Sequence, residues 1–287
     1  MIKYSANGNE FEVKMWRFPD TSIGTNICNK DEPCVNTEHV TVEVRFGGEY
    51  NINDTLFAME NVVDALRIKY PLAHVHLRIP YVPYSRQDRV CNSGEGHSLR
   101  VMARKINALD FRTVVTLDPH STVLDALIER CYTLSQIDVF RSVKTSEEWS
   151  ETYIVAPDQG ASKKCEDFAR HVGAAGVIIC NKKRDLATGK IIGFKILDND
   201  LLPGSDFFVL DDICDKGGTF LAVANELISK HAGKIELAVT HGLFTHEKGV
   251  EPLVEMYDEV YTTNSYENGC QHDHLTVIDI ATVERVQ

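Results

Sequence analysis

Short apolar runs rich in Val and Ile alternate with longer amphipathic segments over most of the chain. The short runs have the length and composition of buried strands, and the longer segments carry apolar residues at helical spacing. The pattern predicts helices at Asp54–Ile68, Ser98–Leu109, Ser162–His171 and Thr219–His231. It predicts strands at His74–Pro80, Thr113–Leu117, Tyr153–Ala156, Gly176–Cys180, Phe207–Leu210, Ile235–Thr240, Glu259–Thr262 and Leu275–Ile278.

Strands that alternate with helices favour parallel sheets with helices on both faces, and ligands of such sheets bind at the carboxyl ends of the strands. A length of 287 residues favours two domains. The run Val114–Ser121 is similar in shape to Ile154–Ala161, since each reads as a strand that ends near an aspartate, a turn and a helix. The charged stretch Arg141–Glu151 lies between them, so we predict domains at residues 1–140 and 141–287.

The stretch Phe207–Phe220 carries the clearest chemical signal. Asp211 and Asp212 follow the predicted strand, and the pair Gly217–Gly218 precedes a predicted helix. A strand, a glycine turn and a helix N-terminus together form a phosphate cradle, because glycine lets the backbone N–H groups approach the anion. Carboxylates do not hold phosphate, but they can hold hydroxyls or a metal beside it. The run therefore predicts a site for a sugar phosphate.

A second signal follows the first predicted strand, in Pro80–Arg89. Arg86 and Arg89 enclose Gln87 and Asp88, which makes an anion-binding turn with its own counter-charge. By residue type alone, a solvated loop is the favoured interpretation of such a run.

Composition and charge narrow the class of protein. The chain is 43% hydrophobic and 25% charged, as in soluble globular proteins, and no apolar run approaches the ~20 residues of a membrane helix. The N-terminal residues lack the apolar core of a signal peptide, which predicts a cytoplasmic protein. The net charge of −12 argues against general nucleic-acid binding. The eight cysteines include no Cys-x-x-Cys pair and are predicted to be free thiols.

One histidine pair has the spacing of metal ligands. His272 and His274 flank Asp273, but no third ligand is in evident register, which favours a solvated pair.

Several motifs resemble one family. The Asp211–Thr219 run resembles the PRPP-binding loop that type I phosphoribosyltransferases and PRPP synthetases share. Tyr81–Arg89 resembles the ATP-binding signature of PRPP synthetases, usually Tyr-Ala-Arg-Gln-Asp, which phosphoribosyltransferases lack. Further elements of that family have matches in chain order, so the chain is identified as a member of the PRPP synthetase family. These matches are Arg17–Asp20, Asp118–His120, Ala156–Ala161, Asn181–Arg184 and Thr240–Phe244.

The resemblance implies a fold and a reaction. The fold would be two tandem phosphoribosyltransferase-like α/β domains, each a mainly parallel sheet flanked by helices. The reaction would move the β,γ-diphosphate of ATP to the anomeric hydroxyl of ribose 5-phosphate, which gives PRPP and AMP, with Mg²⁺ as cofactor. The family's adenine hairpin, often supplied to a neighbouring subunit, implies a homo-oligomer built from dimers, with a hexamer as one possible form.

The resemblance also implies residue roles. The implied catalytic residues are Lys182, Arg184 and His120, and the implied magnesium ligands are His120 and Asp158. The residues implied to bind ATP are Phe18, Asp20, Arg86, Gln87 and Asp88. The residues implied to bind the ribose phosphate are Asp211, Asp212, Asp215, Lys216, Gly217, Gly218 and Thr219.

The chain departs from the family pattern at four places. Thr21–Ser22 replaces Gly-Glu in the adenine hairpin, Ala161 replaces a glycine, and Val90–Leu99 replaces an arginine-rich regulatory segment. Lys216 stands where the family has threonine. The variant pattern resembles a branch of the family seen in bacteriophage and beside nicotinamide-salvage enzymes.

Lys216 leaves the acceptor open. A cation beside the 5-phosphate suits an acceptor with more negative charge, such as ADP-ribose, and neutral surface drift explains the substitution equally well. A non-catalytic regulatory homologue is a second alternative. A phosphoribosyltransferase is disfavoured, because it would leave the Arg86-Gln87-Asp88 signature unexplained.

Overall fold

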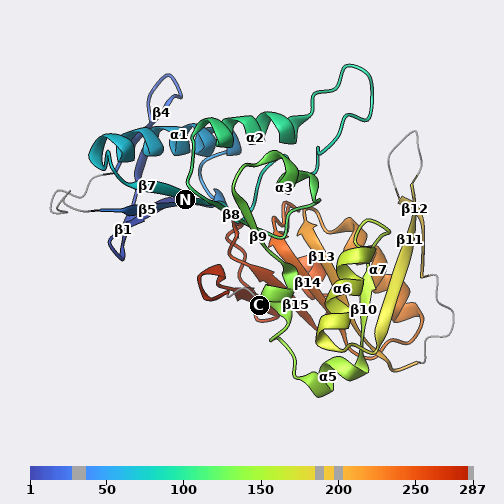
Figure 1. Cartoon of the computed structure of the whole chain (residues 1–287). Helices are drawn as coiled ribbons and strands as arrows, with labels where there is room; N and C mark the ends of the chain where they lie inside the picture. The colour runs from blue at the N-terminus through green and yellow to red at the C-terminus, as the bar shows by residue number, and fades with distance from the viewer. Residues whose placement is uncertain (28–36, 185–190, 197–202, 284–287) are drawn as a thin grey trace. The chain divides into compact units, whose positions relative to one another are not determined.

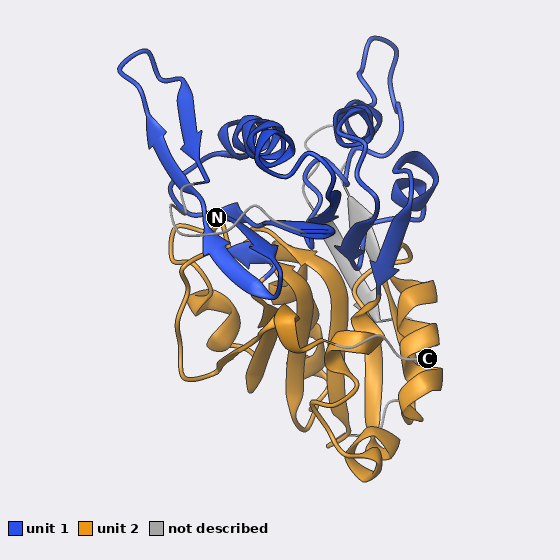
Figure 2. Cartoon of the chain, turned by 60° about the vertical axis from the view of Figure 1, so that its left-hand side comes forward, with its two compact units in different colours: residues 1–134, 265–267 blue, residues 135–264, 268–287 orange. Residues whose placement is uncertain are grey.

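The computed structural model describes residues 1–27, 37–184, 191–196 and 203–283, with the backbone alone for residues 181–184 and 191–196. The chain forms two compact units (Figure 2): unit 1 comprises residues 1–134 and 265–267, and unit 2 comprises residues 135–264 and 268–287. In the stretch expected to separate two domains, helix α5 (Ser146–Glu151) is opened by a capping box between Thr145 and Glu148. The functional domains 1–140 and 141–287 stay a prediction.

Unit 1 contains a six-stranded sheet in the order β2-β1-β5-β7-β8-β9 (Figure 1). The pairs β1–β2 and β1–β5 are antiparallel, and β5 to β9 are parallel. Val40, Val42 and Val44 of β5 are fully buried and the residues between them are not, so one face of this sheet belongs to the core. The elements are β1 (Ile2–Ala6), β2 (Asn9–Glu12), β3 (Lys14–Arg17), β4 (Ile23–Asn26), β5 (His39–Val44), β6 (Phe46–Gly47), α1 (Ile52–Lys69), β7 (His74–Arg78), α2 (Ser98–Ala108), β8 (Val114–Leu117), α3 (Val123–Leu127), β9 (Cys131–Leu134) and β16 (Tyr266–Glu267), which pairs with β6.

Unit 2 contains a seven-stranded sheet in the order β12-β11-β10-β13-β14-β15-β17. The pair β11–β12 is antiparallel, and the others are parallel. Its elements besides α5 are α4 (Gln136–Phe140), β10 (Thr152–Ala156), α6 (Ser162–Val172), β11 (Gly176–Arg184), β12 (Ile191–Ile196), β13 (Asp206–Cys214), α7 (Gly218–Ser229), β14 (Ile235–Gly242), α8 (Glu251–Val254), β15 (Glu259–Thr263), β17 (Leu275–Ile278) and the 3₁₀ helix η1 (Ile280–Thr282).

Strand β13 is buried on both faces. Phe207 and Val209 belong to the same core cluster as Val223 and Leu227 of α7. Phe208 points to the opposite face, as alternation along a strand requires, and its ring stacks on Phe168 of α6 at a centroid distance of 6.2 Å. Helices therefore cover both faces of the unit 2 sheet, and the predicted α/β fold class is confirmed.

All of the predicted strands and helices are present, with small differences at their ends. One difference bears on function, because β13 continues past Leu210 to Cys214. The prediction that Asp211 and Asp212 lie beyond the strand was therefore wrong. Pairing with β14 extends to Cys214, whereas pairing with β10 stops at Val209, so the two aspartates lie where the sheet ends on the β10 side.

Two further expectations concern membranes and cysteines. No helix in the described parts of the chain combines the length and apolar character that crossing a bilayer requires. Cys91, Cys131, Cys165, Cys180, Cys214 and Cys270 are free thiols, and Cys28 and Cys34 lie outside the described residues.

Candidate functional site

Two adjacent carboxylates lie near the carboxyl end of β13. Asp212 is buried and Asp211 is half-buried, and the backbone N–H of Asp212 donates to Oδ1 of Asp211 at 2.9 Å. Burial, and then the negative charge of Asp212, raise the pKa of Asp211 well above its usual range. A pair of this kind favours the arrival of hydroxyl donors or a cation, which relieve the repulsion between the two carboxylates.

A third carboxylate lies beside this pair. Strand β10 neighbours β13 and ends at Ala156, and Asp158 follows in the next turn. The backbone N–H groups of Gly160 and Ala161 donate to Oδ1 of Asp158 at 2.9 and 3.3 Å. The charge of Asp158 contributes to the raised pKa of Asp211. The structure therefore places Asp158 close enough to Asp211 for its charge to act on that carboxyl.

The predicted phosphate cradle joins β13 to α7. Gly217 has a φ of +79°, in the left-handed region that favours glycine, and α7 begins at the next residue. The Thr245 hydroxyl donates to the Asp215 carboxylate, and the Thr245 backbone N–H donates to the Asp215 carbonyl at 3.0 Å. Lys216 is exposed. The turn thus presents a helix N-terminus and an exposed cation, a combination that binds anions.

The two glycines of this turn make a matched pair of substitutions. Gly217→Ala is expected to lower the free energy of unfolding by about 1–2 kcal/mol, because an L-residue is strained at this φ and its Cβ would lie 3.2 Å from Leu253 Cδ2. Gly218→Ala meets no heavy atom within 4 Å and is expected to preserve stability. Urea unfolding checks both variants, and equal losses would contradict the role of backbone strain at Gly217.

In unit 1, the Arg86-Gln87-Asp88 turn lies beside the loop that follows β8. Arg86 and Gln87 are exposed and Asp88 is buried. Burial alone would raise the pKa of Asp88, but hydrogen bonds from Ser121 (2.7 Å) and Arg89 (3.1 Å), with the charge of His120, hold it below its usual range. The structure therefore places Asp88 near His120, two residues that the sequence assigned to one active site.

The loop that carries His120 has a constrained backbone. Asp118 has a φ of +37°, which is uncommon for a residue other than glycine, and its N–H donates to the Leu134 carbonyl at 2.7 Å. Asp118 is buried, whereas His120 is exposed. The buried anchor and the exposed imidazole are consistent with a loop that presents His120 to a ligand.

The predicted adenine hairpin is formed by β3 and β4. Phe18 is 46% exposed and packs edge-on against Trp16, with 5.8 Å between ring centroids. The Asp20 carboxylate accepts hydrogen bonds from the Ser22 hydroxyl (2.7 Å) and N–H (3.1 Å), which lower its pKa. Asp20 thus uses part of its acceptor capacity within the turn, and Phe18 offers a free aromatic edge or face.

Lys182 and Arg184 lie on strand β11, so the predicted start of a loop is part of a strand. Their backbone partners in β12 are Phe194 and Ile191, with an irregular register between Lys183 and Arg184. Their side chains lie outside the described residues, and their catalytic role stays a prediction.

Sequence reasoning missed two side chains that position the predicted residues. Ser121 holds Asp88, and Thr245 holds Asp215. Ser121 directly follows the Asp118–His120 motif, and Thr245 directly follows the Thr240–Phe244 motif. Polar residues at the ends of the motifs were therefore the available signal.

Comparison with known proteins gives a consistent result. No family model matches the chain. The chain is similar to several ribose-phosphate pyrophosphokinases. The protein of Sulfurisphaera tokodaii is 26% identical, and the match covers 71% of this chain and 68% of that protein. The protein of Pyrococcus abyssi is 24% identical, and the match covers 91% of this chain and 86% of that protein. Ribose-phosphate pyrophosphokinase 2 of Archaeoglobus fulgidus is 22% identical over 92% of this chain and 87% of its own length.

A solved structure has the same fold. The phosphoribosylpyrophosphate synthetase of Mycobacterium smegmatis superposes with a TM-score of 0.78 and 21% identity, over 94% of this chain and 87% of that one. The chain thus has the fold of that synthetase, with two α/β units, each built on a mainly parallel sheet flanked by helices. With the relatives above, this shows that the chain is similar to ribose-phosphate pyrophosphokinases (PRPP synthetases) over most of its length.

Proposed function

We propose that this protein is an ATP-dependent diphosphotransferase that acts on the anomeric hydroxyl of ribose 5-phosphate or of a 5-substituted ribose. The main observation is at the end of β13, where Asp211 and Asp212 are followed within a few residues by Gly217 and the N-terminus of helix α7. Carboxylates suit the ribose hydroxyls, and the helix N-terminus suits the 5-phosphate. The names of the similar proteins support the same reaction.

In this proposal two groups of residues bind the two substrates. Arg86, Gln87 and Asp88 bind ATP, with Phe18 and Asp20 at the base. The loop Asp215–Thr219 binds the 5-phosphate of the acceptor, which Asp211 and Asp212 orient through its hydroxyls.

The anomeric oxygen attacks the β-phosphorus of ATP, and the bond from that phosphorus to the oxygen bridging to the α-phosphate breaks. AMP leaves with that oxygen, and the hydroxyl proton passes to solvent. Lys182, Arg184 and His120 stabilise the charge that develops on the transferred group.

Magnesium is the proposed metal. Among the described residues, no three His, Cys, Asp or Glu side chains form a metal-binding group. Mg²⁺ does not need one, since it keeps several waters and binds through one or two protein ligands and substrate phosphates. His120 and Asp158 are the proposed ligands, and the bound ion would neutralise phosphate charge.

Two acceptors, ribose 5-phosphate and ADP-ribose, are compatible with this proposed reaction. Lys216 is exposed in the cradle, where an ammonium group can pair with a second phosphate beyond the first. This favours ADP-ribose as an alternative acceptor, with ADP-ribose pyrophosphate as product and a role in nicotinamide salvage. A cytoplasmic location and a homo-oligomeric assembly stay predictions.

The test is AMP release by the full chain with ATP, Mg²⁺ and either acceptor. We expect release with at least one acceptor. If Lys216 binds the additional phosphate, Lys216→Thr should lower kcat/KM for ADP-ribose at least tenfold, the effect of one charge-assisted contact, and change little with ribose 5-phosphate. Lys230→Thr, at the other end of α7, is the matched control.

Three outcomes separate the alternatives. No AMP with either acceptor, from protein whose circular dichroism shows it folded, would exclude the enzyme and favour a regulatory homologue. Equal effects of Lys216→Thr on both acceptors would exclude its role in selecting ADP-ribose. PRPP consumption in the presence of a nucleobase would instead indicate a phosphoribosyltransferase.

A further inference from the structure

Three histidines lie on one face of the unit 1 sheet. His39 is on β5, and His74 and His76 are on the neighbouring strand β7. The register pairs His39 with His74 and Thr41 with His76. Because residues two apart on a strand share a face, all three imidazoles lie on the face opposite the buried Val40 and Val75.

Two ring nitrogens in this group face each other. His39 Nδ1 and His76 Nε2 are 3.0 Å apart, and the ring centroids of His39 lie 5.2 Å from His76 and 5.7 Å from His74. Two nitrogens that share a tetrahedral zinc ion at ~2.0–2.1 Å are themselves about 3.3 Å apart. The spacing is therefore close to that of two ligands on one metal.

The surroundings of His76 suit a metal ligand. Its other nitrogen, Nδ1, lies 2.7 Å from the Thr113 hydroxyl, which fixes the orientation of the ring.

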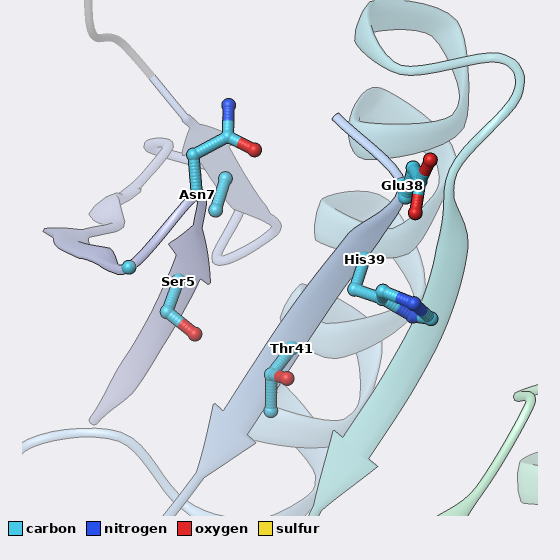
Figure 3. Close-up of a pocket in the computed structure, with 7 residues that line it drawn as sticks. Ser5, Asn7, Glu38, His39 and Thr41 are labelled. Carbon is cyan, nitrogen blue, oxygen red and sulfur yellow. The ribbon is translucent and has the colours of Figure 1, made fainter. Parts of the chain in front are cut away.

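The group is accessible from solvent. A cleft of about 420 Å³ opens beside His39, and Ser5, Asn7, Glu38 and Thr41 also line it (Figure 3). His39 and His74 are exposed, and His76 is half-buried. A hydrated cation can therefore reach His39 without a change in the backbone.

We propose that His39, His74 and His76 form a binding site for a divalent transition metal that prefers imidazole ligands, with Zn²⁺ as the best fit. The metal replaces the contact between His39 and His76. The ring that donates that hydrogen bond moves its proton to its other nitrogen, so both rings present lone pairs and stay neutral. His74 reaches the metal by rotating its exposed side chain, since no three-residue group is preformed among the described residues.

The other histidine pair is a natural comparison. His272 and His274 have ring centroids 5.8 Å apart, but Nδ1 of His272 accepts the His274 backbone N–H at 3.1 Å, and Nδ1 of His274 lies 3.1 Å from the Asp258 carbonyl. Backbone groups thus occupy one nitrogen of each ring. The His272 and His274 pair therefore serves as the control for the proposed site.

The experiment is a Zn²⁺ titration of the full chain, in excess Mg²⁺ and in a Cys91→Ser background that removes an exposed thiol. We expect the parent to bind one more equivalent of Zn²⁺ than the His39→Ala/His76→Ala variant. A His272→Ala/His274→Ala variant should retain that equivalent. His74→Ala and Thr113→Val should each weaken binding by about 10- to 100-fold, as the loss of a ligand or its support does.

Cobalt(II) gives an independent readout, because a site with tetrahedral imidazole ligands produces a visible absorption band. The band should be present in the parent and absent from His39→Ala/His76→Ala. Equal stoichiometry and equal spectra for these two proteins would overturn the proposal. If circular dichroism shows that the variant is unfolded, the test uses the imidazole ¹⁵N NMR signals of the parent protein instead. The absence of Zn²⁺-dependent shifts at His39 and His76 would then overturn the proposal.

Discussion

Asp211→Asn is expected to make the ligand-free protein more stable at neutral pH and less active. Burial and the neighbouring Asp212 raise the pKa of Asp211, which means that the folded chain disfavours its ionised form. An amide of the same shape carries no charge and removes that cost. Each kcal/mol relieved should raise Tm by about 2–4 °C.

The pH dependence distinguishes this cause from a change in packing. The usual pKa of this carboxyl is 3.8, and its folded value is higher, so between the two values the folded chain holds a proton that the unfolded chain has lost. Wild-type stability therefore falls as pH rises above about 3.8 and stops falling above the folded pKa. The Tm advantage of Asp211→Asn should be absent below pH 3.8 and widen as pH rises. A constant difference would contradict the electrostatic explanation.

The same substitution should lower kcat/KM for the acceptor by about 10- to 100-fold, because a charge-assisted hydrogen bond to a ribose hydroxyl contributes ~1.5–3 kcal/mol. Asp206→Asn is the control on the same strand. Asp206 Oδ1 accepts the Lys234 backbone N–H at 2.7 Å at the opposite end of β13. That variant should keep its activity and show no rise in Tm at neutral pH. Loss of activity in both variants would indicate general damage to β13.

The sequence pattern predicted the strands and helices of unit 2 well and missed the first strands of unit 1. Phe207–Leu210 is apolar throughout because helices cover both of its faces, and such runs stand out in a sequence. Strand β1 alternates buried Ile2 and Tyr4 with half-exposed Lys3 and Ser5, and it is only five residues long. An alternating strand of that length differs little from a polar loop.

The sequence motifs identified most residues of the candidate site but not the side chains that hydrogen-bond to them. Asp88 and Asp215 belong to recognisable local runs, whereas their partners Ser121 and Thr245 lie 33 and 30 residues away. Contacts across that separation depend on the order of the strands in the sheet, which no local pattern specifies. Asp118 is similar, because it combines a positive φ with a hydrogen bond from its N–H to the carbonyl of Leu134 at the end of β9.

A buried ion pair in unit 2 should give the largest change in stability. Glu236 of β14 is 1% exposed, and its carboxylate pairs with Lys144, whose side chain is 8% exposed. Lys234, which is 48% exposed, also pairs with Glu236, at 2.8 Å, and the Tyr261 hydroxyl donates to it at 3.3 Å. Removing one partner of a buried pair leaves an uncompensated charge and costs ~3–5 kcal/mol. Glu236→Gln leaves Lys144 without its anion and should lower the free energy of unfolding by about that amount. Lys144→Met should cost less, because Lys234 still pairs with Glu236.

The double variant Lys144→Met/Glu236→Gln should lose much less than the sum of the two single variants, because it leaves no buried charge without a partner, and glutamine still accepts from Tyr261. Lys234→Ala is the matched control and should cost at most ~1 kcal/mol, as half-exposed pairs do. Trp149 reports on this region, since Lys144 Nζ lies 5.9 Å from its ring centroid, and a Trp16→Phe background leaves Trp149 as the single tryptophan. Urea unfolding followed by its fluorescence measures all four variants. If the loss in the double variant equals the sum of the two single losses, the two charges contribute independently and the prediction is contradicted. A pair of charges that is buried together must give a double loss well below that sum.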